Sequence, residues 1–200
     1  MIRKQLQPAV MMTLVLCVVT GLLYPAAVTG LAQVIFPRQA NGSLVMANGR
    51  VVGSELIGQA FTKAEYFHPR PSAAGNGYDA TASGGTNKGP TDAKLADTLI
   101  SQAIETAVNT DGVIKGGIPS DMVTASASGL DPDISPANAR LQVPRVARAR
   151  GVSEAAVGAL VARHVQGRQF GFFGEPRVNV LLLNIAVDSA FGLRKPLSSK

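Results

Sequence analysis

The feature that most constrains this chain is a long uncharged run near its beginning. No charged residue lies between Lys4 and Arg38, and residues 9–24 are almost continuously apolar. A membrane-spanning helix needs about 20 mostly apolar residues to cross roughly 30 Å of hydrocarbon. The run is long enough for this, so we expect a transmembrane anchor over about residues 9–31. The positions that mark the expected span are Ala9, Leu14, Val19, Leu23 and Tyr24.

A cleavable signal peptide is the alternative explanation of this run. Arg3 and Lys4 give it a positive start, and the small residues at 30–32 are a tolerable cleavage site. However, the apolar core of a signal peptide usually covers about 7–15 residues, and this run extends past Tyr24. Length therefore favours a retained anchor. Pro25 predicts that the helix either kinks or ends there.

Basic residues on the two sides of the run predict its orientation. Arg3 and Lys4 precede it, whereas Arg38 is the near basic residue beyond it. Basic residues favour the cytoplasmic side of a membrane. We therefore expect a single-pass protein of the cell inner membrane. Its cytoplasmic N-terminus and anchor would cover residues 1–36, and an extracytoplasmic, periplasmic domain would cover residues 37–200.

The bulk properties suit one compact domain after the anchor. Roughly 160 residues remain there, which is an ordinary domain length. The net charge of +6 is too small to require nucleic acid as a partner. The single cysteine, Cys17, lies inside the apolar run, so the expected domain has neither a thiol nor a disulfide.

Local patterns predict an α+β domain with a small sheet and several helices. The Asn-Gly pair at 48–49 lies between β-prone residues and predicts a hairpin with strands at 43–47 and 50–54. Apolar residues at helical spacing predict a helix over 92–108. Residues 122–125 are a candidate short strand.

Sequence patterns in the second half of the domain predict mostly helices. Ser135 is a candidate N-cap, followed by proline at the first helical position, and this helix is expected to end near Gln142. Pro144 predicts a new start, and Gly151 an end. A further helix is expected over 153–165. A strand should begin at Arg177, with helix preferred from Leu181 to Phe191.

The helices around Gly151 also match a second function. Two short helices with basic residues over 146–164 are typical of a DNA-reading helix-turn-helix in a cytoplasmic regulator. A helix pair packed in an ordinary core gives the same pattern. Because the domain is expected outside the membrane, we exclude nucleic acid as a partner.

No motif for catalysis or metal binding is complete. In the glycine-rich loop Lys88 precedes Gly89, whereas a phosphate loop needs lysine after its last glycine. The stretch 131–135 begins like a calcium loop, but Pro136 replaces the required glycine. The weak candidates for cofactor binding are Ser83, Gly84, Gly85, Thr86, Asn87, Ser126, Ser128 and Gly129.

Five blocks of sequence resemble one known family and together cover nearly the whole chain. They are Gly58-Gln59-Ala60-Phe61; Tyr66-Phe67-His68-Pro69-Arg70-Pro71-Ser72; Ser83-Gly84-Gly85-Thr86-Asn87 with Gly89-Pro90; Thr124-Ala125-Ser126-Ala127-Ser128-Gly129-Leu130-Asp131-Pro132 with Ile134-Ser135-Pro136; and Arg177-Val178-Asn179-Val180-Leu181 with Leu183-Asn184. On these residues the chain resembles the C subunit of the bacterial Kdp potassium-transporting ATPase, a P-type pump complex. Ala127, where glycine is expected, and Asp133, where histidine is common, are small departures.

The resemblance implies a non-catalytic accessory subunit of a high-affinity, ATP-driven potassium uptake pump. Its partners would be a channel-like potassium-translocating subunit, a P-type ATP-hydrolysing subunit, a small single-span subunit and the lipid bilayer. It would assemble or stabilise the complex, and the family is described as a catalytic chaperone that raises the ATP affinity of the pump subunit. ATP would then act at the level of the complex, potassium would be the transported ion, and this chain would hold no cofactor firmly.

The expected topology conflicts with a direct ATP site, because ATP is cytoplasmic and the domain should face outward. An assembly role, or gating over the external potassium entrance, is physically easier. The polar loop at 73–90 and the block at 124–136 are then candidate contact surfaces. The alternative function is an exported assembly or binding domain that belongs to another membrane complex.

Overall fold

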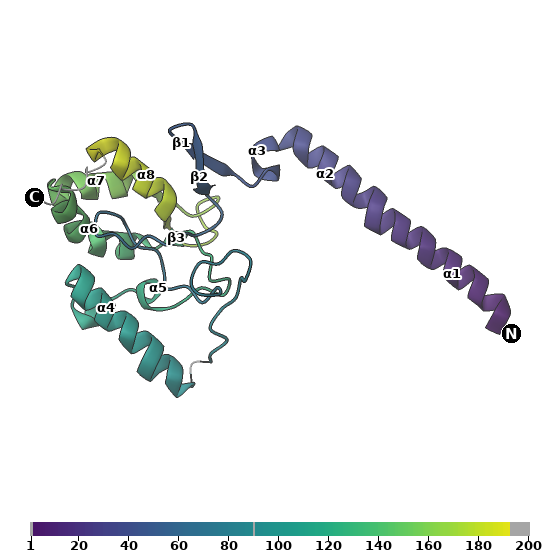
Figure 1. The fold of residues 1–200 in the computed structure, drawn as a ribbon, viewed down its shortest axis with the longest axis horizontal. Coiled ribbons are helices and arrows are strands. Elements are labelled where there is room, and N and C mark those ends of the chain that lie inside the picture. The colour runs from purple at the N-terminus through teal and green to yellow at the C-terminus, as the bar shows by residue number, and fades with distance from the viewer. Residues whose placement is uncertain (1, 90, 193–200) are drawn as a thin grey trace, which may run out of the picture. The chain divides into compact units, whose positions relative to one another are not determined.

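The chain forms two compact units, Met1–Leu44 and Val45–Lys200. The computed structural model describes residues 2–89 and 91–192 (Figure 1). The described part combines helices with small sheets, as expected for an α+β protein. The expected domain boundary after residue 36 stays a prediction.

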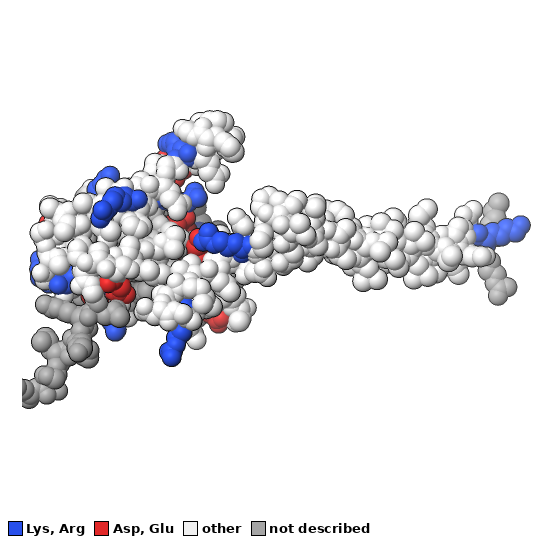
Figure 2. All heavy atoms as spheres, turned by 90° about the horizontal axis from the view of Figure 1, so that it is seen from above, with Lys and Arg blue, Asp and Glu red and all other residues white. Residues whose placement is uncertain are grey.

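The first unit is a long helical segment. It consists of α1 (Ile2–Val18), the π-helical turn η1 (Val19–Leu23) and α2 (Tyr24–Ile35), followed by the short helix α3 (Pro37–Ala40). Residues Lys4–Ile35 are long and apolar enough to cross a membrane, judged by length and composition. Beyond the blue side chains at its N-terminal end, Figure 2 shows this stretch without coloured, charged side chains. The five marked span positions are all exposed in the isolated chain, as suits a surface that faces lipid.

Pro25 does not end the helix, so the second of the two expected outcomes, an end at this proline, is wrong. The N–H of Tyr24 bonds the carbonyl of Val19, five residues back, and the helix continues to Ile35. A proline ring collides with the carbonyl four residues before it in a regular helix. The wider turn of η1 lies immediately before Pro25, where it gives that ring room.

The hairpin expected around the Asn-Gly pair is confirmed. Strands β1 (Leu44–Ala47) and β2 (Arg50–Ser54) pair with each other. Asn48 and Gly49 have φ values of 51° and 74°, the positive values that a two-residue hairpin turn of this type requires.

The helix expected over 92–108 is present, and it ends three residues later than expected, at Asp111. The π-helical segment η2 (Leu95–Ile100) runs into α4 (Ser101–Asp111), and Gly112 caps it with φ 68°. The short 3-10 turn η3 covers Lys115–Gly117. The strand expected at 122–125 is wrong, because Met122 and Val123 belong to the helical turn α5 (Ser120–Val123) and no strand is assigned at 124–125.

Helix α6 (Pro136–Arg150) is continuous, so the expected break at Pro144 is wrong. The capping expectation is confirmed, since the Ser135 hydroxyl accepts the N–H of Asn138 and Gly151 ends the helix with φ 69°. Val143 and Val146, on either side of the proline, are buried in the core. Packing therefore holds this helix together through a residue that disfavours it.

The core is built from helices packed on a three-stranded antiparallel sheet. The strand order is β3 (Asp133–Ile134), β5 (Arg177–Asn179), β4 (Val165–Gln166), so β5 is central. Helix α7 (Glu154–His164) follows α6, and α8 (Val180–Phe191) follows β5 directly, which confirms the preference for helix there. The buried cluster comprises Phe67, Ile134, Ala139, Val143, Val146, Ala147, Val157, Leu160, Val161, Val178, Val180, Leu183 and Val187. Because α6 and α7 pack here, the helix-turn-helix pattern belongs to the core.

Candidate functional site

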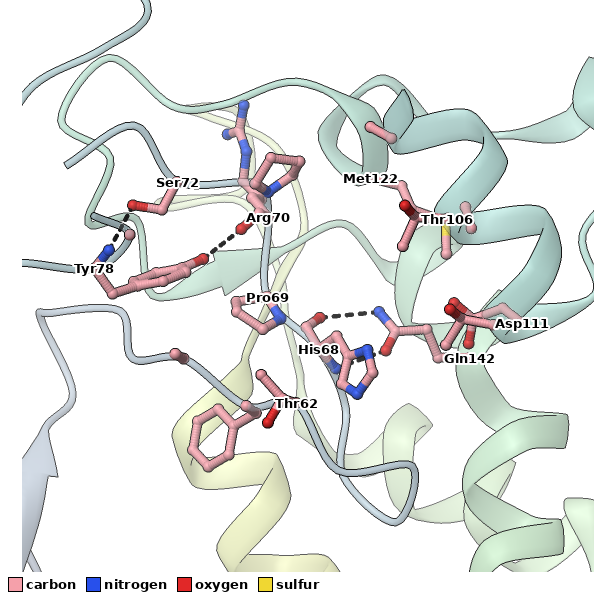
Figure 3. Close-up of a pocket in the computed structure, with 17 residues that line it drawn as sticks. Thr62, His68, Pro69, Arg70, Ser72, Tyr78, Thr106, Asp111, Met122 and Gln142 are labelled. Atoms are coloured by element: carbon pink, nitrogen blue, oxygen red, sulfur yellow. Dashed lines mark hydrogen bonds between the residues drawn. The ribbon is translucent and has the colours of Figure 1, made fainter. Parts of the chain in front are cut away.

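Two side-chain amides from different helices bond consecutive residues of the segment at 66–70. Asn184 of α8 accepts the N–H of Phe67 at 2.8 Å and donates to its carbonyl at 3.0 Å. Gln142 of α6 accepts the N–H of His68 at 2.7 Å and donates to its carbonyl at 3.0 Å (Figure 3). A primary amide offers one acceptor and donors side by side, as a peptide group does. The two amides therefore act as neighbouring strands would, and we call this pair the amide clamp.

The Gln142 end of the clamp is positioned by polar residues on the buried face of α6. Asn138 accepts from Gln142 Nε2 at 2.8 Å, and Arg145 donates to Gln142 Oε1 at 2.7 Å. Asn138 in turn donates to Asp121 at 3.0 Å. In the described part of the chain every fully buried side-chain nitrogen and oxygen has a partner. This polar face is therefore a satisfied network, which fixes the segment in one position.

Two buried arginines tie the same segment to other helices. Arg145 pairs with Asp111, at the end of α4, at 2.6 Å. It also donates to the carbonyl of Tyr66 in the segment and to that of Ala64, just before the segment. Arg150 pairs with Asp188 at 2.7 Å and lies over the Tyr66 ring at 4.9 Å. Burial, and then the hydrogen bond to Asp188, raises the pKa of Tyr66.

Arg70 connects this segment to the block at 124–131. Its guanidinium pairs with Asp131 at 2.9 Å and donates to the carbonyl of Thr124. The Tyr78 hydroxyl donates to the Arg70 carbonyl (Figure 3). Burial, and then the Asp131 charge, raises the pKa of Tyr78. The Ser72 hydroxyl donates to the Gly129 carbonyl at 2.6 Å, which adds a second bond between the two blocks.

The structure brings the weak cofactor candidates together on one surface. Gly84 N–H donates to the Ser128 carbonyl at 2.9 Å, and the Ser83 hydroxyl donates to the same carbonyl at 3.0 Å. We call this meeting of residues 83–87 with 126–129 the seam. A Cβ atom on Gly85 would lie 2.9 Å from the Ala127 carbonyl oxygen, and one on Gly129 2.6 Å from that of Gly84. Glycine is therefore required on both sides for this approach.

A cavity of about 560 Å³ lies between the segment and α4 (Figure 3). Phe61, Pro71 and Met122 give it apolar walls, while Thr106 and His68 add polar groups. Burial, and then the Arg145 charge, lowers the pKa of His68. Among the described residues no three His, Cys, Asp or Glu side chains are grouped to hold a metal ion. The hollow can accept a small apolar group, but its walls hold no nucleophile paired with a base.

The remaining motif residues have structural positions around the sheet. Ser135 and Asn179 cap α6 and α8, and Pro136 starts α6. Arg177 pairs with Asp133 at 3.0 Å. The carbonyls of Pro132 and Gly89 accept the N–H groups of Val180 and Asp92, respectively. Pro90 lies outside the described residues.

Sequence reasoning missed the residues that organise the site. Local patterns predict Gln142 only as a helix end, and they pair neither Arg145 nor Asp111 with a partner. One signal was available, because Asn138, Gln142 and Arg145 recur at i, i+4 and i+7 and so share a helix face with apolar neighbours. Polar residues on a face that must be buried indicate an internal network.

Comparison with known proteins identifies the family. The family model described as "K+-transporting ATPase, c chain" matches residues 6–189. The potassium-transporting ATPase KdpC subunit of Gemmatimonas aurantiaca is 60% identical over 187 residues, covering 93% of each chain. The KdpC subunit of Koribacter versatilis is 54% identical over 97% of this chain and 99% of its own, and that of Caulobacter vibrioides is 56% identical over 98% of both. With matches over nearly its whole length, the chain belongs to the KdpC family of potassium-transporting ATPase subunits.

Proposed function

We propose that this chain anchors itself through α1–α2 and holds a potassium-pump complex together through the seam. Its family makes it an accessory subunit of a potassium-transporting ATPase, and potassium is the ion that the complex transports. The proposal rests on the seam, where two distant motif blocks form one surface fixed by Arg70 and Ser72. Two glycines and several hydrogen bonds hold this surface in shape, and the described residues show no group of side chains arranged for catalysis. Such a surface suits protein contact.

The seam is poorly suited to hold ATP directly. A phosphate loop points unpaired backbone N–H groups at the anion. Here the N–H groups of Gly84 and Gly129 donate to the carbonyls of Ser128 and Ser126. We therefore assign ATP to the complex as a whole, so that this subunit raises ATP affinity indirectly, by stabilising the assembled pump for high-affinity uptake.

The partners that fit this role are the other subunits of the pump. They are a channel-like potassium-translocating subunit, a P-type ATP-hydrolysing subunit and a small single-span subunit. An extracytoplasmic domain meets the outer face of the channel-like subunit most directly. Contact there would stabilise the complex next to the external potassium entrance.

The contact role can be tested with two exposed alanines. Ala127 lies on the seam, and Ala162 lies on α7. We expect Ala127→Arg to reduce the amount of ATPase subunits that co-purify with the tagged chain by about tenfold, because an unpaired charge is costly in an interface. Ala162→Arg should leave the yield unchanged. Equal yields for the two variants would exclude the seam as the contact surface.

The orientation is a separate part of the proposal and needs its own test. The excess of basic charge in the first turn of α1 favours a cytoplasmic N-terminus for a chain in the cell inner membrane. In a Cys17→Ser background, an impermeant maleimide should label Ile114→Cys from outside spheroplasts and Gln5→Cys only after lysis. The reverse labelling would show that the domain faces the cytoplasm.

A further inference from the structure

A protruding loop between β4 and β5 carries three exposed phenylalanines. We call residues 167–176 the aromatic loop. Phe170, Phe172 and Phe173 are 87%, 65% and 58% exposed. Large apolar side chains grouped on a surface mark a site that contacts a protein or a membrane. Neither the seam nor the amide clamp includes this loop.

The aromatic loop is held in shape by its own bonds. Gln169 and Phe173 exchange both backbone hydrogen bonds at 2.9 Å, and Gly171 N–H donates to the Arg168 carbonyl at 3.2 Å. The charged groups stay at the base, where Arg168 pairs with Glu175 at 2.7 Å. The tip therefore presents aromatic rings and no charged side chain. Its backbone groups named above are already hydrogen-bonded, which matters because lipid offers them no partners.

The base of this loop is bonded to the start of the domain, next to the β1–β2 hairpin that follows the anchor in the sequence. Asn179 of β5, just after the loop, donates to the Glu55 carbonyl at 2.8 Å. Glu55 directly follows β2, whose partner β1 receives the chain from the first unit. Leu56 and Ile57 come next and are also exposed, at 59% and 41%. Exposed apolar side chains therefore occur on both segments that meet at the Asn179–Glu55 bond.

The chain keeps this part of the domain within reach of the bilayer. Only eight residues separate Ile35, at the end of α2, from Leu44, at the start of β1. Even a fully extended chain of this length spans only about 30 Å. If α1–α2 span a bilayer, its surface therefore stays near this part of the domain. Phenylalanine is among the side chains that membrane-surface segments bury at the boundary between headgroups and acyl chains.

We propose that the aromatic loop inserts its phenylalanines into the lipid–water interface as a second membrane contact. This inference rests on the proposed anchoring of the chain by α1–α2, and it holds for either side of the membrane. The contact restricts how the domain is oriented above the bilayer. A pocket on another pump subunit is the competing occupant, and the experiment below separates the two.

The chain contains no tryptophan, so a single introduced one reports on its surroundings alone. We would compare Phe170→Trp with Ile114→Trp, a position that is 85% exposed elsewhere, in the full-length chain in phosphatidylcholine–phosphatidylglycerol nanodiscs. With brominated acyl chains, Phe170→Trp should lose roughly half of its emission and be shifted to the blue, as a ring in the interface would be. Ile114→Trp should change little. Unquenched Phe170→Trp emission, in a chain that resists carbonate extraction, overturns the lipid contact but leaves the anchor intact.

The assembled pump supplies the second arm of the test. A photo-reactive benzoylphenylalanine in place of Phe172, illuminated in native membranes, should form adducts with lipid. A cross-link to another pump subunit overturns the proposal and assigns the loop to a protein contact. Extraction of the chain by carbonate would instead show that the proposed anchoring itself is wrong.

Discussion

The side-chain amide of Gln142 bonds both backbone groups of His68, at 2.7 Å and 3.0 Å. The same arrangement recurs one residue earlier, between Asn184 and Phe67. Side chains from two helices thus bond consecutive residues of a segment that belongs to neither sheet of the described structure. Arg70 of this segment bonds Thr124 and Asp131, on either side of the seam residues 126–129, and Ser72, just after the segment, bonds Gly129. The clamp therefore helps to position the surface on which the proposed function depends.

The first prediction concerns the clamp. Gln142→Ala removes the partners of His68 N–H and C=O and leaves Arg145 with one acceptor fewer. Since each buried unsatisfied group costs about 1–3 kcal/mol, we expect the domain to lose about 3 kcal/mol of stability. Urea unfolding of the full chain in mild detergent, followed by tyrosine fluorescence, measures this.

Gln102→Ala is the matched control for the clamp. Gln102 is exposed on α4, so its loss should leave the urea midpoint nearly unchanged. If both variants unfold at the same urea concentration, the amide of Gln142 does not stabilise the segment.

The second prediction is a pH dependence. Burial, and then the Arg145 charge, holds the pKa of His68 below its ordinary value of 6.5. Between the lowered value and 6.5 the unfolded chain binds more protons, so the stability present above about pH 6.5 falls as the pH drops. We expect the melting temperature of the full chain to fall between about pH 7.5 and pH 5.5. In His68→Gln this fall should be smaller, and an equal fall in both chains would contradict the assignment to His68.

The hairpin and the helix caps could be predicted because their causes are local. The turn at Asn48 and Gly49 depends on two residues that tolerate positive φ. Ser135 caps α6 through an N–H only three residues ahead. The membrane run follows from composition alone. In each case the determining residues are neighbours in the sequence.

The amide clamp and the prolines could not be predicted in this way. Phe67 and Asn184 are 117 residues apart, and no local pattern pairs them. Pro25 and Pro144 lie within helical stretches because a π-turn and core packing, respectively, accommodate them. Composition and resemblance indicate both blocks of the seam as candidates. They do not predict that the blocks touch, because that contact depends on distant residues such as Ser72, which bonds Gly129.

The third prediction concerns the buried ion pair that ties α4 to α6. Arg145 and Asp111 are 6% and 4% exposed, so Asp111→Asn leaves a buried charge without its counter-ion. We expect a loss of about 3 kcal/mol and faster hydrogen exchange in the amides of α4. Glu175→Gln breaks the exposed pair with Arg168 and should change neither. Unchanged exchange in α4 after Asp111→Asn would show that other contacts hold this helix.

The fourth prediction concerns the close approach at the seam. Gly129 has φ 67°, and an added Cβ would lie 2.6 Å from both the Ala74 nitrogen and the Gly84 oxygen. We expect Gly129→Ala to separate residues 83–87 from 126–129 and to cost about 1–3 kcal/mol in strain and lost contact. Gly158→Ala, in α7, meets nothing within 4 Å and should stabilise the domain by up to about 1 kcal/mol through helix propensity. Urea midpoints of both chains, with the yield of co-purified ATPase subunits, measure the two effects. Lower yield for Gly129→Ala alone links the shape of the seam to assembly, whereas a wild-type midpoint and yield in that variant would show that the close approach is unimportant.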